Sequence, residues 1–133
     1  MESLSVPMIR GVGIDIIEVS RVEQALARWG ETFVGRLFTA AEAERARHAR
    51  VRSQRLAARF AAKEAVMKAL GTGGMAFRDI EIVRTPSGKP EVRLSGRMQR
   101  RAQRLGVVRI AITISHSRDN AVAVAMAERG GEV

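Results

Sequence analysis

Two carboxylates stand in otherwise apolar segments of this 133-residue chain, where an unpaired charge is costly. Asp15 interrupts the β-branched run Ile9–Ile17, and Glu64 lies within an alanine-rich segment predicted to be a helix from about Gln54 to Leu70. Two carboxylates, with water and phosphate oxygens, are the usual ligands of magnesium in proteins. The pair is therefore a candidate Mg2+ site. The alternative interpretations of Asp15 are a strand-end turn or cap, or a partner for one of the many arginines.

Two lysines accompany Glu64 on the predicted helix. Lys68 follows Glu64 by four residues, so the two side chains face the same way. On an ordinary helix this is an exposed ion pair worth about 0.3–0.5 kcal/mol. Here nearly every other face of the helix is apolar, which favours a functional site. Lys63 lies within the apolar stripe, and the alternative for it is a stem that carries its amine to solvent.

The histidines and glycine-rich turns carry less information. His116 follows an apolar strand in ITISHS, and a lone histidine in such a place is more often structural than catalytic. His48 lies among arginines and is interpreted as solvated surface. The runs GVGID at 11–15 and GTGG at 71–74 hint at phosphate binding, but neither matches a P-loop or a dinucleotide fingerprint.

The elements that must position these residues follow the order β-α-α-α-β-β-α-β-β. Ser20 with Glu23, and Thr39, are the expected helix caps. Short turns join the later strands, so the fold class is α+β, with a mostly antiparallel sheet packed on a long central helix. The predicted strands are 9–17, 79–85, 91–94, 107–115 and 120–127, and the predicted helices are 21–29, 40–51, 54–70 and a short basic one between 95 and 106.

Length and composition suit one compact domain, which we expect over residues 9–128, with a short disordered leader at 1–8 and a tail at 129–133. The absence of cysteine excludes disulfides, zinc–thiolate sites and a cysteine nucleophile, and fits a cytoplasmic protein. No apolar run approaches the ~20 residues of a membrane span. The chain is short and its third helix is apolar on nearly every face, so we expect neighbouring subunits to cover that helix.

The formal net charge of +9 predicts an acidic partner. A nucleic-acid-binding domain is one alternative. Aromatic residues make up only 4% of the chain, which leaves no platform for stacking bases, and neither an RNA-recognition signature nor a helix-turn-helix pattern occurs. We therefore expect no nucleic-acid partner and no membrane partner.

Several segments together resemble the bacterial holo-acyl-carrier-protein synthases, the small phosphopantetheinyl transferases. The resemblance spans about Ile9 to Glu128 and is specific where the KEAxxKA helix combines with an upstream GxD. It implies the phosphopantetheinyl-transferase fold and transfer of 4'-phosphopantetheine from coenzyme A to a serine of apo-acyl carrier protein, in support of fatty acid biosynthesis. The matching segments are GVGIDIIEVSR at 11–21, RFAAKEAVMKALGTG at 59–73, DIEI at 79–82, SGKP at 87–90 and ISHS at 114–117.

The resemblance also implies roles for individual residues and a homotrimer with active sites at subunit interfaces. The stretch 74–76 is shorter than in many members, which leaves the shape of the substrate groove open. A non-catalytic binder of coenzyme A or carrier protein is a second alternative, but it would not need a metal pair. The implied residues are Asp15 and Glu64 for magnesium, Glu64 and Lys68 for catalysis, Lys63, Gly88, Pro90 and His116 for coenzyme A, and Arg21 and Arg28 for docking an acidic acyl carrier protein.

Overall fold

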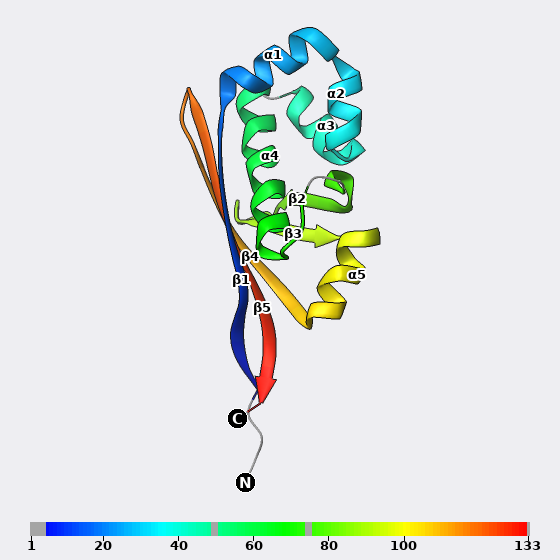
Figure 1. Ribbon diagram of the computed structural model, residues 1–133. Coiled ribbons are helices and arrows are strands. Elements are labelled where there is room, and N and C mark those ends of the chain that lie inside the picture. The colour runs from blue at the N-terminus through cyan, green and yellow to red at the C-terminus, as the bar shows by residue number, and fades with distance from the viewer. Residues whose placement is uncertain (1–4, 49–50, 74–75, 133) are drawn as a thin grey trace.

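A computed structural model describes residues 5–48, 51–73 and 76–132 (Figure 1). Within these residues, five strands and five α-helices follow nearly the expected order, with one helix more than expected between the first two strands. In chain order they are β1 (Ser5–Glu18), α1 (Val19–Trp29), α2 (Glu31–Leu37), α3 (Ala40–Arg47), α4 (Arg52–Ala69), the 3-10 turn η1 (Phe77–Asp79), β2 (Ile80–Arg84), β3 (Pro90–Leu94), α5 (Gly96–Leu105), β4 (Val107–His116) and β5 (Asn120–Glu132).

The strands form two antiparallel sheets rather than one. The larger sheet has the order β1-β5-β4, and β2 pairs with β3 in a separate hairpin. The long helix α4 lies along one face of the larger sheet, with α1, α2 and α3 at one end (Figure 1). The α+β class and the central helix are thus confirmed.

Small residues bring β1 unusually close to α4. A Cβ atom at Gly13 would lie 1.9 Å from the carbonyl oxygen of Ala65, and one at Gly11 would lie 2.0 Å from that of Ala69. Only glycine permits this approach of strand to helix. Because side chains alternate along a strand, Asp15 lies on the same side of β1 as Gly13 and therefore next to α4.

We expect Gly13→Ala to destabilise the protein by about 1–3 kcal/mol, because the added methyl group would push β1 away from α4. Urea denaturation measures the loss. Gly35→Ala is the matched control: a Cβ there meets nothing within 4 Å, and alanine favours the helix, so stability should stay constant or rise slightly. Equal stability of Gly13→Ala and wild type would contradict the close packing.

The helix caps agree only partly with the sequence. Thr39 caps α3 with a full capping box: the amide of Glu42 donates to Oγ1 of Thr39, and the amide of Thr39 donates to Oε1 of Glu42. The prediction for Ser20 is wrong, because α1 begins at Val19 and has no side-chain cap. The short helix α2 was not predicted.

Both ends of the described chain are strand rather than loose segments. β1 begins at Ser5, and its residues 5–9 pair with residues 128–132 of β5. The expected disordered leader is therefore wrong for 5–8, while 1–4 lie outside the described residues. In the part of the chain that the structure describes, no helix is both long and apolar enough to cross a membrane.

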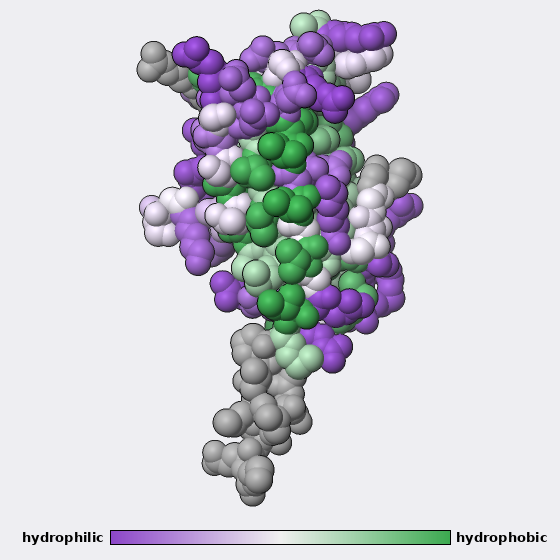
Figure 2. Space-filling view, turned by 60° about the vertical axis from the view of Figure 1, so that its left-hand side comes forward, coloured by the Kyte–Doolittle hydropathy of each residue, from purple (hydrophilic) through white to green (hydrophobic). Residues whose placement is uncertain are grey.

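The uncovered apolar surface lies on the sheet and not on α4. The side chains of α4 from Leu56 to Leu70 are largely buried within one chain, so the expectation that a neighbour must cover this helix is wrong. An apolar stripe instead runs along the face of the sheet turned away from α4 (Figure 2). We call it the outer sheet face. It includes Val12, Ile14 and Ile16, each more than half exposed, together with Val122, Val124 and Met126.

Candidate active site

Asp15 and Lys68 meet where β1 crosses α4. Nζ of Lys68 donates to the carbonyl oxygen of Ile14 at 2.9 Å and lies 3.2 Å from Oδ1 of Asp15. The Asp15 side chain is only 18% exposed, whereas Lys68 is half exposed. An ammonium group has three N–H donors, so one donor of Lys68 is left for a bound anion.

Glu64 completes the charged group. Its pKa is raised, first because its carboxylate is partly buried and second because the negative charge of Asp15 is near; Lys68 opposes both effects. Asp15 thus contacts Lys68, and Glu64 lies near enough to both for their charges to affect its pKa. A cation between the two carboxylates would relieve their repulsion.

The donor set fits magnesium. Within residues 5–48, 51–73 and 76–132, no group of three or more histidine, cysteine or acidic residues could hold a metal. Mg2+ is commonly held by one or two carboxylates, with water and substrate phosphates in its other positions. Asp15 and Glu64 match that pattern and leave room for a phosphate-bearing substrate.

A second, basic site lies on the other side of α4. It is a pocket of about 330 Å³ between α4, the β2–β3 hairpin and the end of β4. We call it the arginine pocket. His116 and Pro90 line it, as expected of residues that contact a nucleotide, but Gly88 does not: it forms the hairpin turn, with φ of 88°. The pocket also contains three arginines that the sequence did not single out, Arg55, Arg59 and Arg84.

Arg59 is the least exposed of these arginines, with 4% of its surface accessible. Burial lowers the pKa of its guanidinium, and the nearby carboxylate of Glu42 opposes that shift. The Nε atom of Arg59 is buried and has no hydrogen-bond partner. Guanidinium groups bind phosphate in a bidentate manner, so three arginines and a histidine around one pocket favour a phosphate-bearing ligand.

The carboxylates and the arginine pocket lie on opposite sides of the chain. Arg55 and Glu64 are nine residues apart on α4, which at about 100° per residue places them about 180° apart. The sheet separates the sites in the same way: Asp15 is on β1, one edge of the order β1-β5-β4, and His116 is on β4, the other edge. Within one chain the two sites therefore open on opposite sides of α4.

Lys63 does not belong to either site. Its side chain is 0% exposed, and its Nζ contacts Oε1 of Glu42 at 2.6 Å and the carbonyl oxygens of Phe77 and Ile80 at 2.8 and 2.7 Å. All three N–H donors are used, so none remains for a phosphate. The predicted contact with coenzyme A is therefore wrong for this structure, and so is the alternative of a solvated amine.

Arg21 and Arg28 are both exposed on α1, which follows β1 directly. Among the described residues neither forms an ion pair. The guanidinium of Arg28 lies 4.9 Å from the ring centroid of Trp29, which is 56% exposed. A neighbouring groove of about 310 Å³ is lined by Trp29, Thr32, Phe33, Arg36 and Leu37. This end of the molecule thus combines positive charge with an exposed aromatic ring.

The fold and site define a phosphopantetheinyl transferase. The profile of the 4'-phosphopantetheinyl transferase superfamily matches residues 11–125, and the chain belongs to that superfamily. Within it, the chain belongs to the holo-[acyl-carrier-protein] synthases. It is 46% identical to the synthase of Clostridium kluyveri, over 91% of each chain, and 47% identical to that of Solidesulfovibrio magneticus, over 91% of this chain and 99% of the relative.

Solved structures agree with this assignment. The holo-[acyl-carrier-protein] synthase of Neisseria meningitidis superposes with a TM-score of 0.86 at 34% identity, over 92% of this chain and all of the other. The synthase of Bacillus anthracis, solved in complex with coenzyme A (3',5'-ADP), has a TM-score of 0.76 at 37% identity, over 92% of this chain and 98% of the other.

Proposed function

We propose that this protein transfers 4'-phosphopantetheine from coenzyme A to a serine of apo-acyl carrier protein, and so supports fatty acid biosynthesis. The observation that carries the proposal is the meeting of Asp15, Glu64 and Lys68 at the crossing of β1 and α4, in a chain that belongs to the holo-[acyl-carrier-protein] synthases. No comparable feature favours a nucleic-acid-binding domain. Action in the cytoplasm stays a prediction from the sequence.

The reaction is a phosphoryl-type transfer. The serine oxygen bonds to the β-phosphorus of coenzyme A while the bond from that phosphorus to the bridging oxygen breaks, which releases adenosine 3',5'-bisphosphate. The serine proton passes to Glu64 or to solvent. Lys68 uses two of its donors on Ile14 and Asp15, and its third neutralises charge on the phosphate.

Asp15 and Glu64 would hold magnesium. When bound there, the ion neutralises the diphosphate and stabilises the leaving oxygen. The fold keeps the two carboxylates close enough for the charge of Asp15 to raise the pKa of Glu64. A cation bound between them would therefore be stabilised by both charges.

The arginine pocket would hold the nucleotide of coenzyme A. Arg55, Arg59 and Arg84 supply charge for its phosphates, and His116 and Pro90 line the same space. Because the pocket and the carboxylates face opposite ways in one chain, we propose that the active site forms between the β1 side of one subunit and the β4 side of the next. A head-to-tail contact forms a ring when its rotation closes, and we propose the homotrimer that the resemblance implied.

The outer sheet face is the natural contact between subunits, because a contiguous exposed apolar stripe marks an interaction surface. We expect light scattering to give the mass of three chains. Val124→Asp, which places a charge in the middle of this face, should yield folded monomers with little transfer activity. A fully active monomer, of either wild type or Val124→Asp, would refute the shared site.

Arg21 and Arg28 would steer an acidic carrier protein onto the site, since surface complementarity acts mainly on the encounter rate. We expect the double reversal Arg21→Glu with Arg28→Glu to weaken use of carrier protein about ten-fold or more at low salt. The KM for coenzyme A should barely change. Steady-state kinetics for both substrates at low and high salt measure this. Arg100→Glu with Arg104→Glu, which changes two exposed arginines on α5, is the matched control. If the double reversal weakened affinity for coenzyme A instead, the assignment of Arg21 and Arg28 to carrier-protein docking would be wrong.

Mass spectrometry tests the function itself. Purified protein is incubated with coenzyme A, Mg2+ and an apo-acyl carrier protein. The carrier protein should gain the mass of one phosphopantetheine group, and a carrier whose acceptor serine is replaced by alanine should gain none. No gain of mass by any apo-acyl carrier protein tested would contradict the proposal.

A further inference from the structure

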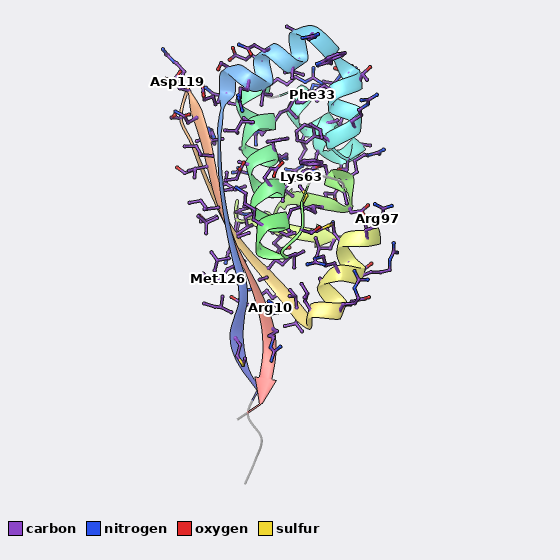
Figure 3. All side chains as sticks on the ribbon, viewed as in Figure 1. Arg10, Phe33, Lys63, Arg97, Asp119 and Met126 are labelled. Atoms are coloured by element: carbon purple, nitrogen blue, oxygen red, sulfur yellow. The ribbon has the colours of Figure 1, made fainter. Side chains whose placement is uncertain are left out.

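A buried ion pair that takes no part in the proposed reaction joins α3 to α4. Nζ of Lys63 and Oε1 of Glu42 lie 2.6 Å apart, and the two side chains are 0% and 1% exposed. Figure 3 labels Lys63 on α4. Burying two charges is costly unless all their donors and acceptors are satisfied. The other contacts of the pair therefore decide what it does.

Those contacts are with the backbone of β2. Lys63 donates to the carbonyl oxygen of Ile80 at 2.7 Å, and Oε2 of Glu42 accepts the amide of Ile82 at 2.9 Å. Backbone groups two residues apart in a strand point to the same side. The ion pair thus offers β2 one acceptor and one donor, as a neighbouring strand would.

The other edge of β2 is already occupied by β3. Bonds across the hairpin are made by alternate residues: the amide of Thr85 donates to the carbonyl of Lys89, and the amide of Ser95 to that of Asp79. Ile80 and Ile82 fall between these positions, so their backbone groups point away from β3. The ion pair therefore occupies the free edge of β2 and fastens the hairpin to α3 and α4.

The fastened hairpin is one wall of the arginine pocket. Ile82, Arg84 and Pro90 come from the hairpin, while Arg55 and Arg59 face them from α4. Ile82 is shared: its amide binds Glu42 and it lines the pocket. The distance between the arginines of α4 and Arg84 is thus set at the point where the pair holds β2.

We infer that the Lys63–Glu42 pair is a positioning device for the nucleotide: by docking the free edge of β2 it sets the width of the arginine pocket and hence the affinity for coenzyme A. The inference rests on the proposed function, because it assigns the pair to the pocket used in that reaction. Lys63 and Glu42 are positioning residues and do not touch the substrate.

The double variant Lys63→Met with Glu42→Leu tests this. Apolar residues of similar volume often replace a buried ion pair at no loss of stability, so the protein should fold. The amide of Ile82 should exchange with solvent faster. The dissociation constant of adenosine 3',5'-bisphosphate, and the KM for coenzyme A, should rise about ten-fold, as when one charge-assisted contact is misaligned. The kcat and the KM for carrier protein should stay near wild type.

The control is Arg52→Met with Glu31→Leu, which removes an ion pair between α2 and α4 that does not line the pocket. It should leave nucleotide binding unchanged. Wild-type nucleotide affinity in the Lys63–Glu42 double variant would overturn the inference, as would a loss of kcat alone. Failure of that variant to fold would also overturn it, since the pair would then be a requirement of folding.

These results are separate from those on the function. If the proposed reaction is wrong, wild type itself does not transfer phosphopantetheine, whether or not it binds the bisphosphate. If only the positioning role is wrong, wild type does both and the double variant binds the nucleotide equally well.

Discussion

Asp15→Ala and Glu64→Ala should each reduce phosphopantetheine transfer at least about 10²-fold while the protein stays folded. Replacing a residue that only hydrogen-bonds to a metal ligand already costs about 10–100-fold in metal affinity or activity. These variants remove a proposed ligand itself, so a larger loss is expected. Among the described residues no third acidic, histidine or cysteine side chain joins Asp15 and Glu64 in a possible metal site, so no other group makes good the loss of either. The rate at which carrier protein gains mass, measured over a range of Mg2+ concentrations, gives the effect.

Stability should behave differently from activity in these variants. The raised pKa of Glu64 means that its ionised form is less stable in the folded protein than in the unfolded chain. That penalty is absent at low pH and appears as the pH rises through the folded pKa. At neutral pH, loss of the Glu64 charge should therefore not lower the melting temperature of Glu64→Ala below that of wild type. Asp15→Ala removes a partly exposed ion pair, which is worth at most about 1 kcal/mol.

Glu44→Ala is the control for general effects of removing an acid. Glu44 is exposed on α3, and its partners among the described residues are Arg47 and His48, both close to it in the chain. It should transfer at the wild-type rate. Near-normal turnover by Asp15→Ala or Glu64→Ala at ordinary Mg2+ concentrations would remove the metal assignment.

Residue types and local context were enough to find the carboxylates. Asp15 and Glu64 were conspicuous because a charge in an apolar strand or on an apolar helix needs a partner. Their meeting depends on the glycines of β1, which let the strand lie against α4. That approach is a property of the packed fold, so the sequence indicated the two residues without showing that their charges lie close together.

The sequence was less informative about groups whose partners come from distant segments. Arg59 and Arg84 belong to α4 and β2, and only folding places them around one pocket. Lys63 looked like a site residue because its charge lies within an apolar stripe. Its partner, Glu42, is on a different helix. Glu42 also belongs to the capping box of α3, so its position in the sequence gives no sign of a second partner. A buried lysine and a ligand-binding lysine have the same local pattern.

The reason for which the sequence predicted an oligomer also failed to anticipate the packing. An apolar helix suggested an oligomer, but α4 is covered within one chain by the sheet and the neighbouring helices. Side chains alternate along β1 and β5, which leaves Ile14 and Val124 on the face turned away from α4. Which face α4 covers is decided by the small side chains of β5, such as Ala123 and Ala125, which are almost wholly buried.

The sharpest consequence of the divided site is that two inactive chains should restore one another. One variant, Glu64→Ala, inactivates the carboxylate side of the chain. The other, Arg84→Ala with His116→Ala, inactivates the arginine pocket on the opposite side. In a mixed assembly, a site regains function when an intact carboxylate side from one chain faces an intact pocket from the other. In a trimer that contains both variants, one of the three interfaces combines an intact carboxylate side with an intact pocket, so roughly a third of wild-type activity should return.

Co-expression of the two variants with different affinity tags, and purification through both, isolates the mixed assemblies. Their initial rates at subsaturating coenzyme A are compared with those of each variant alone, which should be close to zero. Glu64→Ala with Asp15→Ala is the matched control: both changes spoil the same half, so every site keeps a defective carboxylate pair and the mixture stays inactive. If the first mixture also stays inactive although both tags are present, each active site is complete within one chain, and the shared arrangement is wrong.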